Sequence, residues 1–161
     1  MTRAEPLTPI EILRTAGVAF SCFSHPPIRT YDDIVRELRL PADQLLKTMA
    51  FRTDGGKFVL ISLPILSAVK YGRLAKATGV PRSQLRRAGP DDLKELGTAP
   101  GGVSPLTFRS GTLVAFDTSV RAMETVYCGS GRDDETIKIE ASSLIEVVQP
   151  LFAQLAADES A

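Results

Sequence analysis

Histidine, cysteine and tryptophan are scarce in this sequence, and their scarcity excludes several kinds of site. The chain has one histidine, His25, two cysteines, Cys22 and Cys128, and no tryptophan. One histidine and two separated cysteines cannot supply a usual zinc ligand set, so we expect neither a metal ion nor a cofactor. Two cysteines are also too few for a disulfide framework. We therefore expect both to be small buried hydrophobes in a protein of the reducing cytoplasm.

The usual catalytic motifs are missing as well. Cys22 and His25 are close enough in sequence to suggest a nucleophile and its base. Residues three apart on a strand point to opposite faces, however, which argues against such a pair. The sequence also lacks the nucleophile elbow G-x-S-x-G, the dinucleotide fingerprint G-x-G-x-x-G and the glycine spacing of a P-loop. Any catalysis must therefore rest on other groups.

Long apolar runs are absent too. No run approaches the roughly 20 residues that span a bilayer, and residues 1–9 lack the apolar stretch of a secretory signal. The chain has 161 residues, of which 43% are hydrophobic and 24% charged, values typical of a globular protein. We expect one domain over 1–161, with its core at about 8–157, in the cytoplasm and without membrane contact.

Net charge is zero, which by itself argues against a nucleic-acid partner. The charges are nevertheless segregated. Six lysines and arginines lie between Lys70 and Arg87 without an acidic residue among them, whereas acids gather at Asp91–Asp92, Asp133–Glu135 and Asp158–Glu159. The basic segment is either a solvated helical face or a patch that faces phosphates, and the complete segregation favours the patch.

Capping and turn residues outline a mixed chain. Thr8 and Thr30 are expected to cap two short helices, the first ending at Gly17 and the second before Pro41, and Asp54-Gly55-Gly56 predicts a hairpin. The other expected elements are helices over Ser67–Thr78, Pro90–Leu96 and Ser143–Ala157, and strands over Val18–Ser24, Lys47–Thr53, Lys57–Leu63, Thr112–Phe116, Glu124–Cys128 and Thr136–Glu140. Some of these strands are joined by hairpins and others by helices. This predicts a single α/β domain of α+β type, with a mixed, mostly antiparallel sheet surrounded by helices.

Two features are candidates for a binding site. The segment Gly101-Gly102-Val103-Ser104-Pro105 can turn several main-chain N–H groups into one concavity that holds a carboxyl or ester oxygen, although it can also be a tight structural turn. Lys47 opens an apolar strand, where a lysine either serves a site or extends its ammonium from the sheet edge to solvent.

Several landmarks, in order, resemble the YbaK/prolyl-tRNA synthetase-associated editing-domain family. They are His25-Pro26 after the first strand, Lys47-Thr48 opening the next, a basic helix ending in Leu74–Gly79, the G-x-x-x-P signature as Gly101 to Pro105, Phe116-Asp117 at a strand end and a Gly-Ser-Gly hairpin at Gly129–Gly131. Two departures, Thr98 after Gly97 and a longer, more acidic final hairpin, affect the pocket that chooses the amino acid.

The resemblance implies roles for particular residues. Lys47 would hold the 3′ end of tRNA through phosphate, and the glycine loop would grip the aminoacyl ester. The implied catalytic set is Lys47, Gly101, Gly102, Ser104 and Pro105. The implied substrate-binding set is Phe23, His25, Thr30, Thr48, Val103, Asp117, Gly129, Ser130 and Gly131. The implied tRNA-binding residues are Lys70, Arg73 and Lys76. For His25 a purely structural hydrogen bond at the strand end is an equal alternative.

The function that the resemblance implies is deacylation of mischarged aminoacyl-tRNA. The expected substrate is tRNA(Pro) carrying alanine or cysteine, edited in trans, with prolyl-tRNA synthetase as a candidate partner. Substrate groups and bound water would drive the hydrolysis, which accounts for the missing catalytic motifs. The alternative is a module of the same fold that binds aminoacyl-tRNA or a nucleotide without turnover.

Overall fold

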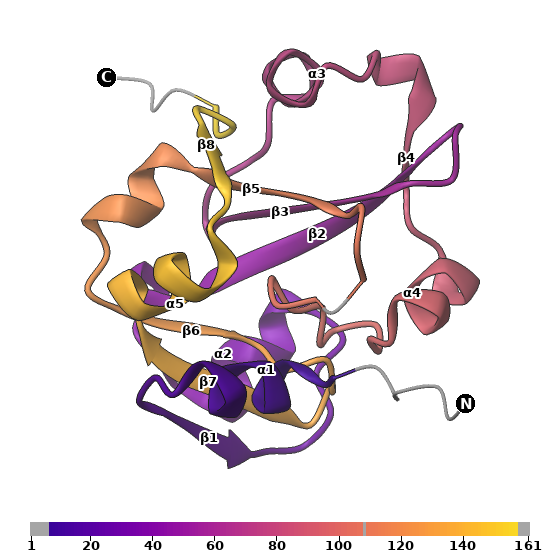
Figure 1. Ribbon diagram of the computed structural model, residues 1–161. Helices are drawn as coiled ribbons and strands as arrows, with labels where there is room; N and C mark the ends of the chain where they lie inside the picture. Colours follow the sequence, from indigo (N-terminus) through magenta and orange to yellow (C-terminus); the bar gives the residue numbers. More distant parts are fainter. Residues whose placement is uncertain (1–6, 108, 158–161) are drawn as a thin grey trace.

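The computed structural model describes residues 7–107 and 109–157, and its strands form two sheets (Figure 1). A three-stranded antiparallel sheet has the order β1-β7-β6, and a five-stranded mixed sheet has the order β4-β2-β3-β5-β8. The strands are β1 (Phe20–Ser24), β2 (Leu46–Thr53), β3 (Phe58–Pro64), β4 (Leu85–Arg87), β5 (Leu113–Asp117), β6 (Thr125–Gly129), β7 (Glu135–Glu140) and β8 (Leu151–Ala153). The α-helices are α1 (Pro9–Ala16), α2 (Tyr31–Leu38), α3 (Tyr71–Thr78), α4 (Pro90–Leu96) and α5 (Ala141–Val148), and short 3-10 turns lie at η1 (Ala42–Gln44), η2 (Arg82–Gln84) and η3 (Thr118–Ala122).

Strand β3 is the centre of the larger sheet. It runs antiparallel to β2 and parallel to β5, and its residues from Phe58 to Leu63 are all buried. A continuous apolar run is what a strand covered on both faces requires. Helix α3 packs on one face through Leu74, and α4 packs on the other through Leu93 and Leu96. The predicted mixed α+β class is confirmed.

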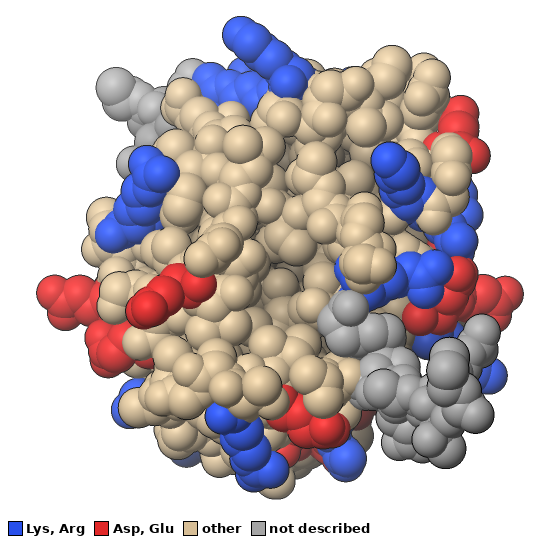
Figure 2. All heavy atoms as spheres, in the orientation of Figure 1, with Lys and Arg blue, Asp and Glu red and all other residues tan. Residues whose placement is uncertain are grey.

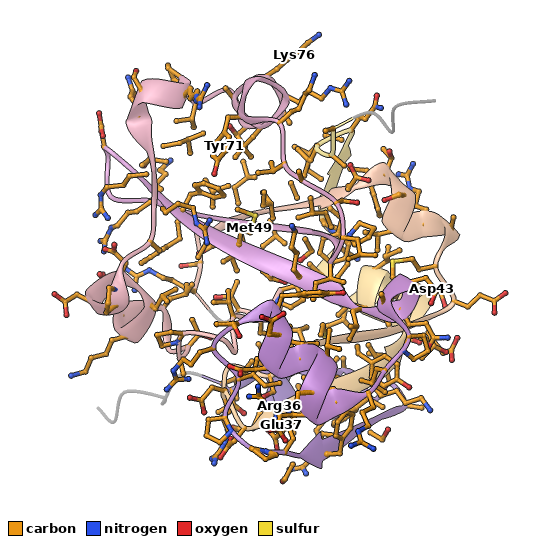
Figure 3. All side chains as sticks on the ribbon, turned by 180° about the vertical axis from the view of Figure 1, so that it is seen from behind. Arg36, Glu37, Asp43, Met49, Tyr71 and Lys76 are labelled. Atoms are coloured by element: carbon orange, nitrogen blue, oxygen red, sulfur yellow. The ribbon has the colours of Figure 1, made fainter. Side chains whose placement is uncertain are left out.

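The smaller sheet has two different faces. One face, with Ile137 and Ile139 of β7, packs against α1 and α5 in a common apolar core. Because side chains alternate along a strand, Thr136 and Lys138 point to the other face. Helix α2 covers this second face, as the view from behind shows (Figure 3). None of the residues of α2 is fully buried, so this helix lies over a space rather than over a packed core.

The predicted helix starts are confirmed at two positions. The Thr8 hydroxyl accepts a hydrogen bond from the Glu11 N–H, and Thr30 and Asp33 form a reciprocal capping box at the start of α2. Gly17 ends α1 with a positive φ of 73°. These contacts are local in sequence, which is why residue order alone could predict them.

Two predicted helices have different bounds. The last helix was expected over Ser143–Ala157, but α5 begins at Ala141 and ends at Val148. Gln149 has a left-handed backbone with φ 48°, and Pro150 cannot continue a helix, so the chain turns into β8. The helix expected from Ser67 begins only at Tyr71, because the preceding segment bonds to the C-terminal strand region: Lys70 N–H donates to the Leu155 carbonyl. Of the predicted acidic clusters, Asp158–Glu159 lies outside the described residues.

Candidate active site

A cavity of about 310 Å³ lies between α2, the first half of β2 and the outer face of the smaller sheet. Its volume is at the lower end of the range for small-molecule sites. The lining residues are His25, Ile28, Ile34, Leu38, Leu45, Leu46, Lys47, Thr48, Ile65, Arg87, Leu93, Pro100, Gly101, Val103, Tyr127, Cys128, Gly129, Glu135 and Thr136. Most are apolar, and the polar side chains come from β2, β4, β7 and the residue that follows β1.

Lys47 and Arg87 provide positive charge on the β2–β4 side of the cavity. Lys47 is half-buried, and its pKa is lowered, first by burial and then by the charge of Arg87. Within residues 7–107 and 109–157, neither side chain forms an ion pair with a carboxylate. Glu135 also lines the cavity, but no carboxylate among the described residues forms an ion pair with either of these two cations.

The glycine loop meets the cavity because its backbone fits closely against two other segments. Gly101 has φ 84°, and a Cβ there would lie 1.9 Å from the Ile28 carbonyl oxygen. A Cβ at Gly102 would lie 2.2 Å from the Arg132 carbonyl oxygen. Both distances are below any real contact, so only glycine allows this approach. The Gly131 N–H donates to the Gly102 carbonyl at 2.7 Å and ties the loop to the final hairpin.

Two main-chain donors of this loop are available to a ligand. Gly101 is exposed and Val103 half-buried, and both line the cavity. In the part of the chain that the structure describes, the N–H groups of Gly101 and Val103 have no acceptor, whereas the Gly102 N–H is used by the Ala99 carbonyl. Two uncommitted N–H groups two residues apart in one loop can bind an oxyanion or a carbonyl oxygen if both point to it.

His25 fixes the hydroxyl of Thr136 on the smaller sheet. The ring nitrogens lie 2.8 Å from the Pro26 carbonyl oxygen, through Nδ1, and 2.8 Å from the Thr136 Oγ1, through Nε2. A carbonyl only accepts, so Nδ1 donates and, in the neutral ring, Nε2 accepts the hydroxyl proton of Thr136. The Phe23 ring packs edge-on against the His25 ring. Thr136, buried but lining the cavity, thereby presents oxygen lone pairs as acceptors.

The cysteines differ from the expectation that both are buried. Cys22 is exposed on β1, an edge strand whose outer side pairs with no described strand, whereas Cys128 lies on β6, which also bridges to Leu45 through Tyr127. Cys128 is fully buried, and burial raises the pKa of its thiol to about 12. Although Cys128 lines the cavity, a thiol with such a pKa is not a nucleophile at neutral pH.

Six of the predicted site residues line the one cavity: His25, Lys47, Thr48, Gly101, Val103 and Gly129. Four others support it from outside. Thr30 caps α2, the Ser104 Oγ accepts from the Leu106 N–H at 3.2 Å, the Ser130 Oγ donates to the Glu135 carbonyl at 2.9 Å, and Pro105 is buried. Gly102, Gly131 and Phe23 pack behind the lining residues.

Asp117 is placed elsewhere. Its carboxylate accepts from the main-chain N–H groups of Leu155 and Ala156, at 2.8 and 2.9 Å, and thereby ties β5 to the segment after β8. These hydrogen bonds, with those from Ser119, lower its pKa although burial opposes them. Asp117 borders a different depression, with Ser67 and Thr118, and does not line the cavity described above.

The predicted tRNA-binding residues lie on and beside α3. Lys and Arg atoms are prominent over α3 at the top of the face in Figure 2, and Lys76 points away from the body in Figure 3. The Arg73 guanidinium donates to the Ala156 carbonyl at 2.5 Å. Lys70, Arg73 and Lys76 do not line the cavity. The basic segment is thus divided, since Arg87 at its end faces the cavity and Arg86 pairs with Asp92 at 2.6 Å.

Sequence reasoning missed Arg87, Tyr127, Glu135 and Thr136 as cavity residues. Arg87 was visible only as the last member of the basic run. Glu135 and Thr136 of β7 could not be identified from their residue types alone. Thr136 is a neighbour of the predicted residues Phe23 and Gly129 only because β7 pairs with both β1 and β6. No three His, Cys, Asp or Glu side chains among the described residues could hold a metal ion, and none of the described helices is long and apolar enough to cross a membrane.

Comparison with known proteins places this geometry in a family. The family model for the aminoacyl-tRNA editing domain matches residues 25–147. The hypothetical protein APE2540 superposes with a TM-score of 0.80 at 20% identity, covering 92% of this chain and 98% of its own. A candidate trans-editing enzyme for prolyl-tRNA synthetase superposes with a TM-score of 0.73 at 20% identity, covering 86% and 87%. The matched residues include the cavity and its glycine loop, and the chain belongs to the aminoacyl-tRNA editing domain family.

Proposed function

We propose that this protein hydrolyses the ester of mischarged aminoacyl-tRNA in trans, on tRNA(Pro) carrying alanine or cysteine. One observation carries the proposal: Lys47 lines the same cavity as Gly101 and Val103, whose N–H groups have no acceptor among the described residues. A cation and a pair of main-chain donors match the two anionic features of the substrate end, a phosphate and the oxyanion that forms during ester hydrolysis.

The reaction needs little chemistry from the protein. Water forms a bond to the ester carbonyl carbon, the carbonyl oxygen becomes an oxyanion held by the two N–H groups, and the bond to the ribose oxygen then breaks as that oxygen takes a proton. The neighbouring ribose hydroxyl, or the thiol of a cysteinyl substrate, assists the water. An aminoacyl ester is already activated, so positioning and oxyanion stabilisation supply most of the acceleration.

The walls of the cavity favour a small apolar amino acid. Ile28, Ile34 and Leu38 line the cavity with apolar side chains on the α2 side. Apolar pockets bind a small apolar group and discriminate weakly between groups that differ by one methylene. This supports alanine and cysteine together as substrates. The structural similarity to a candidate trans-editing enzyme for prolyl-tRNA synthetase is the reason for proposing tRNA(Pro) as substrate and this synthetase as partner.

The test is a panel of tRNA(Pro) charged with Ala, Cys, Ser or Pro, in which loss of the acyl group is followed over time. Lys47→Ala should slow deacylation of the preferred species more than tenfold, because a charged phosphate contact contributes roughly 1.5–3 kcal/mol. Lys57→Ala is the matched control, since Lys57 is an exposed lysine of the β2–β3 turn outside the cavity. Equal rates for the two variants would remove Lys47 from the site. Binding of all four species without hydrolysis of any would favour the non-catalytic module.

A further inference from the structure

Arg87 lines the cavity, but the hydrolysis proposed above gives its side chain no role. It ends β4, where it stands opposite Phe51 of β2, and its guanidinium carbon lies 5.7 Å from the centre of the Phe51 ring. Phe51 and Lys47 are four residues apart on the same strand, so their side chains share a face. The register of β4 therefore brings Arg87 to the face of Lys47, and both residues line the cavity.

The surroundings of Arg87 differ from those of the nearby arginines. Arg52, Arg86 and Arg109 each pair with an acid of α4, Asp92 or Glu95. For Arg87, by contrast, no carboxylate among the described residues lies within ion-pair distance, and the same holds for Lys47. Glu135 also lines the cavity but pairs with neither cation. Two cations that share a cavity repel each other, and the charge of Arg87 contributes to the lowered pKa of Lys47. A bound anion would relieve that repulsion.

We propose that Arg87, beside Lys47, binds the 5′-phosphate of the terminal nucleotide of the aminoacylated tRNA. This rests on the proposed function, because the glycine loop would hold the ester of that same nucleotide. The nearest anion to the ester in the substrate is this phosphate. Arg87 offers a planar pair of N–H donors that fits two phosphate oxygens, and Lys47 adds a point charge. Arg87 is then a positioning residue that sets the distance between phosphate and glycine loop.

The experiment compares two small substrates that differ in one phosphate. These are 3′-O-alanyl-adenosine and 3′-O-alanyl-adenosine 5′-phosphate, and kcat/KM is measured for each. The wild-type protein should prefer the phosphorylated substrate, and Arg87→Ala should lose tenfold or more with it while keeping its rate on the nucleoside. Arg87→Gln, which keeps a long side chain over Phe51, should lose the same preference. Arg14→Ala is the control, because Arg14 is exposed on α1 outside the cavity.

Binding of adenosine 5′-monophosphate and of adenosine, measured by calorimetry, gives a readout independent of turnover. Wild-type protein should bind the monophosphate more tightly than adenosine, and in both Arg87 variants this preference should fall at least tenfold, to the part that Lys47 contributes. Equal losses on both substrates, or an undiminished phosphate preference in Arg87→Gln, would overturn the role of Arg87. Failure of the wild-type protein to deacylate any aminoacyl-tRNA would overturn the proposed function instead, whatever the nucleotide binding shows.

Discussion

Replacing Gly101 by alanine should both destabilise the protein and impair the site, and Gly17 offers a matched control. The two glycines have similar backbones, with φ 84° at Gly101 and φ 73° at Gly17. A left-handed backbone costs an alanine roughly 1–2 kcal/mol at either position. At Gly17 a Cβ meets nothing within 4 Å, whereas at Gly101 it would lie 1.9 Å from the Ile28 carbonyl oxygen.

The extra cost at Gly101 follows from that collision. The loop must move by more than 1 Å to reach the 3.0 Å separation of real contacts, and forced overpacking of this kind costs roughly 1–3 kcal/mol. For a chain of this length each kcal/mol lowers Tm by roughly 2–4 °C. A 1 Å displacement of the donors at Gly101 and Val103 should lower kcat/KM for deacylation about 100-fold.

Thermal unfolding and deacylation kinetics on the two variants provide the measurement. Gly17→Ala should be destabilised only by the cost of placing an alanine in a left-handed backbone, and it should keep the wild-type kcat/KM. Gly101→Ala should lose more stability than Gly17→Ala and most of its activity. If the two variants match in Tm and in kcat/KM, the close approach of the loop to Ile28 has no part in the site and the reasoning is wrong. A bulkier replacement such as Gly101→Val would test folding rather than the cavity.

Three further outcomes are expected. A disulfide reagent at pH 8 should label one thiol in the folded protein, Cys22, and two after denaturation, because Cys128 is buried and its pKa is about 12; two fast thiols in the native state would contradict this. Asp92→Asn should reduce the free energy of unfolding at neutral pH, because hydrogen bonds, chiefly from Arg86, lower the pKa of Asp92 in the folded protein. This stabilisation is lost as the carboxylate is protonated, so the difference from wild type should shrink below the unfolded pKa of 3.8. Urea titrations at pH 7 and pH 3 measure the difference, and a value independent of pH would refute the reasoning. Lys76→Glu should raise the KM for tRNA and reduce the slope of log affinity against log salt by about one or more, and unchanged salt dependence would make α3 a solvated face only.

Local signals in the sequence were enough to place most elements. The caps at Thr8 and Thr30, the hairpin at Asp54–Gly56 and the helix stopped by Gly97 all depend on residues within one turn of each other. The short strand β4 was missed because three residues give no alternating pattern, and its place depends on pairing with β2. The end of α5 was misplaced because hydrogen bonds with the distant Asp117 and Ala68 hold the C-terminal segment extended.

The residues of the cavity likewise divide into those that local sequence signals reveal and those that depend on contacts between distant segments. Lys47 and the glycine loop were identified as candidates from their residue types, and the structure brings both to one cavity. Arg87 and Thr136 could not be found in this way, because an arginine in a basic run and a threonine in a strand are ordinary there. Their relevance depends on cross-strand register, Phe51 with Arg87 and Phe23 with Thr136, and register is a property of the folded sheet.

The backbone contact among Ile28, Gly101, Gly102 and Arg132 has a consequence for the time at which the protein becomes active. The segments around Ile28, Gly101 and Arg132 are far apart in the sequence, and all three must be in contact before the loop takes this position. A fragment that lacks one of them would therefore not form the cavity. During synthesis on the ribosome the chain would remain inert until the final hairpin has left the exit tunnel. The proposed editing activity would therefore be absent from every nascent chain that stops short of this hairpin.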